Sequence, residues 1–409
     1  MFQSLRQPGV MMVTLAAAGI LMVTMGVRQS FGLFVAPISQ STGLSVVSIS
    51  FALAVGQLAW GAIQPVAGIY ADRYGSERIL MLGLLLLALA CGWTVVSSSV
   101  WGLTLSLGLL ANMGAGIASF SVLMGAVAQK IPAAARGEAS GLINAGGSFG
   151  QVVFAPTVQQ LIAWMGWVGC LLSLAVTSLL ALPLIRKLRD SSPQLSTAKP
   201  ERSANTGQQL KQTVVYALRD RNYLLLNIGF FTCGFHIAFL VTHLPGEIDL
   251  CGLPPSVAGW SLALIGLANV VGSIVAGACV ARYKSKNILA LMYASRALLV
   301  LWYMLMPKTE WVFYVFALGL GLSWLATVPP TASIVTTLYG SRYLATLFGL
   351  SLLSHQIGAF FGAWLGGVAL YSFGDFSWMW WADIALALIA AGVNLPIQEK
   401  RQYQMAANH

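Results

Sequence analysis

The chain is dominated by long runs of apolar residues separated by short polar segments. Each run has about 18 or more residues, enough for a helix to cross a hydrocarbon core of roughly 30 Å. The first run begins at Gly9, is too long for a signal-peptide core and lacks a convincing cleavage site, so we expect it to be retained. The predicted spans are residues 9–35, 47–71, 79–98, 101–127, 138–163, 165–185, 222–245, 256–281, 287–306, 311–335, 343–371 and 377–397.

This pattern predicts an all-α membrane protein with 12 transmembrane helices. The composition agrees, because 57% of the residues are hydrophobic and only 8% are charged, against roughly 25% charged residues in soluble domains. The 42 glycines suit helices that pack closely in lipid. The prolines Pro329 and Pro330 are expected to break the tenth span.

The positions of the charges predict the orientation. With the amino terminus inside, 19 of the 22 Lys and Arg residues fall in cytoplasmic segments, and Lys308 alone lies in an outside loop. Arg28 and Arg296 lie within spans. This asymmetry predicts a multi-pass protein of the cytoplasmic (inner) membrane with both termini inside. It accounts for the formal charge of +10 without nucleic acid as a partner, and we expect a monomer in the bilayer.

The spans fall into two related groups of six. Residues 1–185 and 222–409 are predicted to form two six-helix bundles, joined by the polar segment 186–221, which is typical of a flexible cytoplasmic linker. The two groups share a pattern at an offset of 208 or 209 residues. The matches are Gly26, Arg28 and Pro37 with Gly234, His236 and Pro245; Gly141 and Gly150 with Gly349 and Gly358; and Gly68, Arg73 and Tyr74 with Gly277, Arg282 and Tyr283. Such repeats place a solute site at their interface near mid-membrane.

The loop between the second and third spans carries a recognisable motif. Residues 68–78 read Gly-Ile-Tyr-Ala-Asp-Arg-Tyr-Gly-Ser-Glu-Arg, which resembles the loop signature of the major facilitator superfamily. Glu77 replaces one basic residue of that signature, and in the second half Ala281 and Lys284 replace its Asp and its second Gly. Gly75 would allow a turn with positive φ. The resemblance implies transport by alternating access, with a gating role for Gly68, Asp72, Arg73, Gly75 and Arg78.

Four further stretches resemble bacterial relatives of the monocarboxylate porters. They are Arg28–Phe34, Cys233–His236, Thr327–Thr331 and Ser354–Gly358. This resemblance implies a small organic anion as the substrate. The better-known carboxylate porters often place a basic residue in the eighth helix, whereas Trp260–Gly277 here has no charge and carries only Asn269.

Arg28 is the most informative ionisable residue. A central Arg costs roughly 2.5–3.5 kcal/mol on insertion scales, so it needs a reason to be there. No acidic residue occurs in its span, and a guanidinium can hold a carboxylate with two parallel hydrogen bonds. The alternatives are that Arg28 snorkels at the outer end of its helix or braces the seventh helix.

The remaining candidates are polar side chains inside spans. His236 has the position equivalent to Arg28, and His243, two turns later, is expected on the same face. We predict substrate binding by Arg28, His236, His355, Gln356, Asn112 and Asn269, and proton coupling through His236, His243 or Glu247. Each could instead be a structural hydrogen-bonding group between helices, which is the interpretation favoured for His243 and for Arg296. Gln57, Asn144 and Gln151 could also line the cavity or join helices.

The scarcity of acidic residues narrows the substrate class. Of 12 acidic residues, only Asp383 falls clearly within a span, near its outer end, so an anionic or neutral solute fits better than a cation. No cofactor, metal site or enzymatic activity is expected, because nucleotide-binding, metal-spacing and nucleophile motifs are missing and the five cysteines resemble buried hydrophobic residues. The alternatives are efflux of amphipathic drugs or metabolites, and a non-transporting membrane sensor.

Overall fold

The computed structural model describes residues 8–97, 99–132, 135–188, 205–280, 282–340 and 344–400, and within them the chain is helical and contains no strand. The N-half comprises α1 (Pro8–Gln29), η2 (Phe31–Phe34), α2 (Val35–Thr42), α3 (Val46–Tyr74), α4 (Ser76–Val95), α5 (Val100–Leu103), η3 (Thr104–Leu110), α6 (Ala111–Ile117), α7 (Phe120–Ala128), α8 (Arg136–Leu180), α9 (Leu182–Ile185) and η5 (Arg186–Leu188). The C-half comprises α10 (Asn205–Ala217), α11 (Arg221–Leu250), α12 (Pro255–Val280), α13 (Ser285–Leu305), α14 (Glu310–Ser323), α15 (Val328–Tyr339), α16 (Leu344–Phe373) and α17 (Ser377–Asn394).

The predicted all-α transmembrane fold is confirmed. Ten helical segments among the described residues are long and apolar enough to cross a membrane. One of them, Glu138–Leu188, is divided by the non-helical Gly166 (φ 72°), which separates the predicted fifth and sixth spans. The twelfth is α17, whose 18 residues include Asp383 and three tryptophans that lower its hydropathy. The break predicted in the tenth span is present, because α14 ends at Ser323 and α15 begins at Val328.

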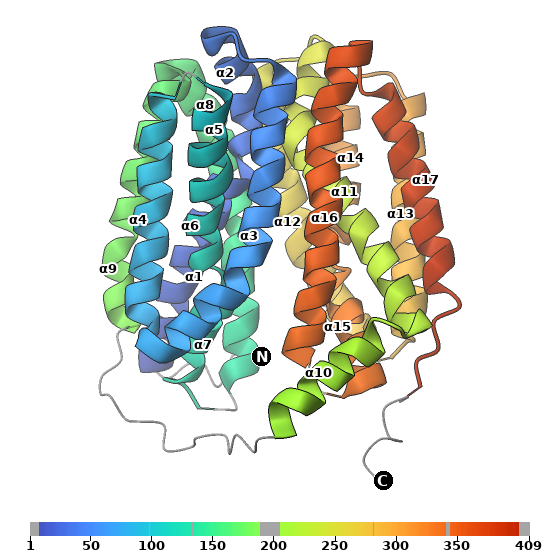
Figure 1. Cartoon of the computed structure of the whole chain (residues 1–409). Coiled ribbons are helices and arrows are strands. Elements are labelled where there is room, and N and C mark those ends of the chain that lie inside the picture. Colours follow the sequence, from blue (N-terminus) through green and yellow to red (C-terminus); the bar gives the residue numbers. More distant parts are fainter. Residues whose placement is uncertain are drawn as a thin grey trace.

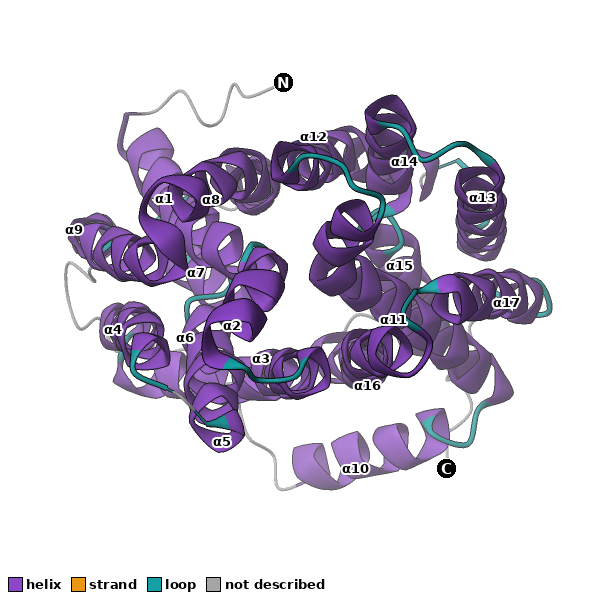
Figure 2. Cartoon of the chain, turned by 90° about the horizontal axis from the view of Figure 1, so that it is seen from above, coloured by secondary structure: helices purple, strands orange, loops and turns teal. Residues whose placement is uncertain are grey.

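The two halves stand side by side as separate groups of upright helices (Figure 1). α2 lies at one end of the molecule and α10 at the other, and we call these ends the α2 side and the α10 side. Seen along the helices, α3 of the N-half lies beside α16, and α8 lies beside α12 (Figure 2). These two pairs of helices are the seams at which the halves meet.

Glycines bring paired helices within each half into backbone contact. A Cβ on Gly234 would overlap the His355 carbonyl oxygen, and one on Gly358 would overlap that of Phe231, so α11 and α16 cross at the closest approach that helices allow. The same contact recurs 208 residues earlier, where Gly150 lies against the Met22 carbonyl oxygen and Gly26 against Phe154. Two of the repeated glycine pairs therefore form equivalent helix crossings.

Among the described residues, close contacts across the seams lie toward the α2 side. In the α3–α16 seam, the Phe51 ring packs edge-on against the rings of Phe360 and Trp364, each with its centroid 6.2 Å away. In the α8–α12 seam, Gly266 packs against Ser148. Closer to the α10 side the remaining repeated glycines have no neighbour within 4 Å of a Cβ; these are Gly68, Gly141, Gly277 and Gly349.

Part of the predicted linker is helical. Residues 205–217 of the predicted flexible segment 186–221 form α10, which lies across the α10 side (Figure 1). Ala217 is buried in a cluster with Tyr223 and Tyr339, and the Tyr216 ring packs edge-on against Tyr339. Burial of this apolar face stabilises a helix that the polar composition did not indicate. Residues 189–204 lie outside the described residues.

The α11–α16 crossing leads to a first prediction. Gly358→Ala forces a methyl group into the Phe231 carbonyl, and overpacking of this kind costs about 1–3 kcal/mol, so the apparent melting temperature in detergent should fall. Gly349→Ala on the same helix is the matched control, because open space surrounds it; it should melt at or slightly above the wild-type temperature. Equal melting of both variants would contradict the close crossing.

Candidate functional site

The Arg28 guanidinium is held by three side chains of the N-half. Its Nε donates to Asn112 Oδ1 at 3.1 Å, and its Nη2 donates to Gln57 Oε1. Its Cζ lies 4.3 Å from the centroid of the Trp60 ring. Arg28 therefore points into its own half toward α3 and α6, rather than out into lipid or against α11. The sequence indicated Arg28, Asn112 and Gln57 as candidates. Nothing in it distinguished Trp60 from the other tryptophans.

Asn112 is oriented by an irregular turn of its own helix. Its Nδ2 donates to the carbonyl oxygens of Leu107 at 3.0 Å and Gly108 at 3.1 Å, both within the π-helical turn η3. A π-helical turn shifts the backbone hydrogen bonds and leaves carbonyls that need other donors. Because both amide hydrogens are used in this way, Asn112 presents only its oxygen to Arg28.

The charge of Arg28 has no fixed counter-charge. Among the described residues, no carboxylate lies within salt-bridge distance of this guanidinium, which is half-buried. Two of its five N–H donors are used by Asn112 and Gln57, which leaves both hydrogens of Nη1 and one of Nη2 for another acceptor. The free N–H groups of Nη1 and Nη2 form an edge of the guanidinium that can donate two hydrogen bonds to the oxygens of a carboxylate.

Gln356 of the C-half meets this region across the α3–α16 seam. It is buried and packs against Gly61, the residue after Trp60, and its Oε1 has no hydrogen-bond partner. The adjacent His355 turns into the C-half instead, with its ring 4.9 Å from that of Phe230. Of the two predicted neighbours, only Gln356 thus reaches the part of α3 that holds Arg28.

Asn269 lies in the other seam and stabilises the broken tenth span. Its Nδ2 donates to Ser148 Oγ of α8 at 3.0 Å, and its Oδ1 accepts from the backbone N–H of Leu325 at 3.0 Å. Leu325 belongs to the turn between α14 and α15, where helical hydrogen bonds are interrupted. Asn269 therefore joins the two halves and is bonded to no member of the Arg28 cluster.

Arg296 holds the same break from the opposite side. This guanidinium is 1% exposed, and its Nη2 donates to the carbonyl oxygens of Ser323 and of Trp324, the latter at 2.9 Å. Its Nε donates to Ser323 Oγ at 3.1 Å, and its Nη1 donates to Cys233 Sγ at 3.3 Å. The expected interhelical role of Arg296 agrees with these contacts, which join α13, α11 and the end of α14.

The two histidines of α11 contact different helices, although they were expected to share a face. His236 Nδ1 lies 2.6 Å from Asp383 Oδ2 of α17, inside the C-half and apart from the Arg28 cluster. His243 Nε2 donates to the Ala363 carbonyl oxygen of α16 at 2.7 Å. Asp383 was noted in the sequence only as an acidic residue near the outer end of a span, and nothing there indicated its partner.

Glu247 faces α13 rather than a seam. Its Oε1 accepts from the Tyr303 hydroxyl at 2.7 Å, and Lys308 Nζ of the following loop lies 3.5 Å from the centre of the Tyr303 ring. Burial lowers the pKa of Lys308, while the charge of Glu247 acts in the opposite direction. The cluster fastens α11 to α13 near the α2 side.

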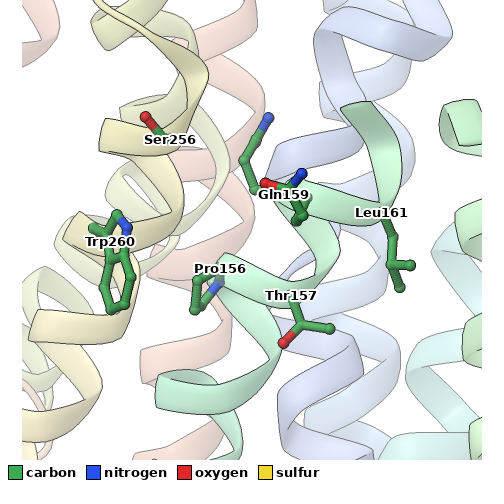
Figure 3. Close-up of a pocket in the computed structure, with 7 residues that line it drawn as sticks. Pro156, Thr157, Gln159, Leu161, Ser256 and Trp260 are labelled. Atoms are coloured by element: carbon green, nitrogen blue, oxygen red, sulfur yellow. The ribbon is translucent and has the colours of Figure 1, made fainter. Parts of the chain in front are cut away.

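Two cavities lie between the halves, and neither includes Arg28. The larger, of about 440 Å³, is on the α2 side and has mostly apolar walls; its polar lining residues are Ser39, Gln40, Gln159, Thr242, His243 and Asp249. The other, of about 400 Å³, is a groove in the α8–α12 seam, with Pro156 and Trp260 on opposite sides (Figure 3). Its lining has no charged side chain, so it provides no cation for an anion, whereas Arg28 does.

The predicted gating residues lie around the turn between α3 and α4. Gly75 has φ +91°, which confirms the expected positive φ. Gly68 faces open space, and the exposed Arg73 has its Cζ 5.3 Å from the centroid of the adjacent Tyr74 ring. Arg78 is exposed. The side chain of Asp72 lies outside the described residues, as does Ala281.

Comparison with known proteins identifies the family. Residues 16–363 match the sequence model of the Major Facilitator Superfamily. The chain is 25% identical to monocarboxylate transporter 13 of Rattus norvegicus over 391 residues, which covers 93% of this chain and 87% of that protein. It is 23% identical to the oxalate:formate antiporter of Oxalobacter formigenes, with coverage of 85% and 82%.

The fold has matches among solved structures. A D-xylose-proton symporter superimposes with a TM-score of 0.73 at 14% identity, over 96% of this chain and 99% of that one. At this identity the likeness supports the helical arrangement alone. It agrees with the two groups of helices in Figure 2.

The contacts of Arg296 give a second prediction. Arg296→Lys keeps the charge, but a single ammonium cannot reach all four acceptors, and each buried acceptor left without a donor costs about 1–3 kcal/mol. The variant should melt well below the wild type in detergent. The exposed Arg282 provides the control, and Arg282→Lys should melt with the wild type. An unchanged melting temperature for Arg296→Lys would show that the break in the tenth span does not depend on the guanidinium.

Proposed function

Because the chain belongs to the Major Facilitator Superfamily, whose members are membrane transporters and not enzymes, we propose that it is a secondary active transporter for a small, monocarboxylate-like organic anion. The protein would lie in the cytoplasmic membrane as a monomer, with the α10 side and both termini in the cytoplasm. The Lys and Arg residues concentrated in the segments of the α10 side support this orientation.

The observation that carries the proposal is the uncompensated charge of Arg28. Two neutral amides and an indole hold the guanidinium in place, so it is oriented without being neutralised. Its remaining donors form an edge that a carboxylate can occupy with two charge-assisted hydrogen bonds. Gln356, which packs against the same part of α3 and has an unpartnered oxygen, would contribute from the C-half; its Nε2 lies 3.4 Å from His355 Nδ1 and has a second hydrogen to donate.

The names of two relatives agree with an anionic substrate. One is a monocarboxylate transporter and the other an oxalate:formate antiporter, and both names describe small carboxylates. The absence of a basic residue from α12, where carboxylate porters often have one, is compatible with this proposal because Arg28 would supply the cation from α1.

The seams support transport by alternating access. We propose that residues 1–185 and 222–409 move as two bundles about the contacts on the α2 side. In this structure the seams are closed there, and the four unpacked repeat glycines would come into contact when the α10 side closes. The loop containing Gly68, Asp72, Arg73, Gly75 and Arg78 adjoins those glycines and would take part in that closure.

Removal of the charge tests the anion site. Arg28→Gln eliminates two charge-assisted hydrogen bonds of roughly 1.5 kcal/mol each, so saturable uptake into proteoliposomes should fall about 100-fold. Labelled lactate, pyruvate, formate and oxalate would serve as probes. Lys400→Gln removes an exposed positive charge far from the seams and should leave uptake unchanged.

Folding is monitored in the same experiment through melting in detergent, where a bound anion should raise the melting temperature of the wild type but not of Arg28→Gln. Retained uptake by Arg28→Gln would remove Arg28 from the site. Export of amphipathic compounds by the wild type, without carboxylate uptake, would replace the proposal by efflux.

A large side chain at Gly349, where no atom lies within 4 Å of a Cβ, tests alternating access. Gly349→Leu fills space that is empty in this structure, so the fold and anion binding should persist. Closure of the α10 side would be hindered, and a bias of about 1.4 kcal/mol would slow uptake on the order of tenfold. Gly392 also has no neighbour within 4 Å but lies on α17, outside the seams, and Gly392→Leu should transport normally. Equal rates for the two variants would argue against closure at Gly349.

A further inference from the structure

The C-half contains a buried acid–base pair that substrate binding at Arg28 does not use. His236 of α11 is 1% exposed and Asp383 of α17 is fully buried, and Nδ1 of the first lies 2.6 Å from Oδ2 of the second. The other polar atom of each side chain, His236 Nε2 and Asp383 Oδ1, has no hydrogen-bond partner. Each of these two atoms can accept a proton.

The two atoms without a hydrogen-bond partner, His236 Nε2 and Asp383 Oδ1, determine where the pair can take up a proton. With one proton on Nδ1, a neutral imidazole donates to a carboxylate and the pair has a charge of −1. A second proton can be added at Nε2 or at Oδ1 and brings the pair to neutrality. Because burial of net charge is unfavourable in a dry interior, proton uptake and release here would be coupled to any change in the surroundings of the pair.

Few other ionisable groups surround it. Cys233 lies one turn away on α11, Arg296 contacts Cys233 from α13, and α16 contributes His355. The other elements packed against α11, namely η2, α2, α12 and α15, contain no Asp, Glu, His, Lys or Arg, and α3 has Asp72 and Arg73 only at its α10-side end. Among the described residues of these elements, Arg296 is the buried cation that contacts α11, through Cys233.

Contacts connect the pair to the seam between the halves. The His236 ring centroid lies 6.3 Å from that of Trp324, the first residue of the break in the tenth span. The next residue, Leu325, donates its N–H to Asn269, which also bonds Ser148 of the N-half. A change in the charge of the pair can therefore be transmitted to the α8–α12 seam, where the two halves meet.

The break itself is not free to take a metal cation. In transporters, unwound carbonyls often coordinate the coupling ion. Here the carbonyl oxygens of Ser323 and Trp324 accept hydrogen bonds from the Arg296 guanidinium, which already supplies positive charge at that point. Besides Arg296 and the Cys233 thiol, which contact the break directly, the His236–Asp383 pair lies next to it through Trp324.

We propose that the His236–Asp383 pair is the proton-binding site that couples anion transport to a proton gradient. This inference rests on the proposed transport of an anion through Arg28. The anion would then bind mainly to the N-half and the proton to the C-half, and the two would cross together in a step that carries no net charge for a monocarboxylate.

The test compares two modes of transport in the same proteoliposomes. An inward proton gradient should drive accumulation of the labelled anion by the wild type, and a dye trapped in the vesicles should report proton entry with it. Asp383→Asn keeps the shape of the side chain but cannot ionise. It should retain exchange of internal for external anion while losing both the accumulation and the dye signal.

The double variant His236→Gln/Asp383→Asn provides a second test, because neither amide can take up a proton at Nε2 or at Oδ1. It should also exchange without accumulating, so the test does not depend on the folding of one variant. Gradient-driven accumulation in either folded variant would overturn the coupling role.

Failure of this inference is distinguishable from failure of the proposed function. Anion uptake by the wild type that ignores the proton gradient would reject coupling through the pair and leave the anion transporter intact. A wild type that neither exchanges nor binds carboxylates would reject the proposed function itself.

Discussion

In the hydrocarbon core a polar group has no water to bond, so each buried charge in this chain depends on compensation by protein atoms. Three charged side chains are compensated by protein atoms in different ways. Arg296 donates four hydrogen bonds to neutral acceptors, Asp383 is paired with His236, and Arg28 donates only two hydrogen bonds. The N–H donors that remain free on Arg28 distinguish a binding group from a structural one.

Glycine residues contribute in two ways: some pack helices tightly within each half, and others leave space at the surfaces of the halves. Gly26 and Gly150, with their counterparts Gly234 and Gly358, pack backbone against backbone within each half. Other repeated glycines, such as Gly68 on α3 and Gly349 on α16, have no neighbour within 4 Å of a Cβ. The first set makes each half a stiff unit, while the second leaves the surfaces between the halves smooth enough to approach each other.

The sequence predicted what depends on local pattern and not what depends on packing partners. Apolar runs gave the spans, and Gly75 and the prolines of the tenth span marked a turn and a break. The partner of His236 lies 147 residues away in another span, so no local signal linked it to Asp383. The π-helical turn that orients Asn112 and the helix α10 are likewise outcomes of tertiary contacts.

Arg28 and His236 occupy equivalent places in the repeat, 208 residues apart, yet their contacts have diverged. The longer Arg28 reaches α3 and α6 and keeps donors free, whereas His236 turns to α17 and is sealed inside its half. The anion and proton sites that we propose lie in different bundles, so coupling between them would pass through the seams. Asn269, bonded to Ser148 on one side and to the broken tenth span on the other, is where the structure provides that connection.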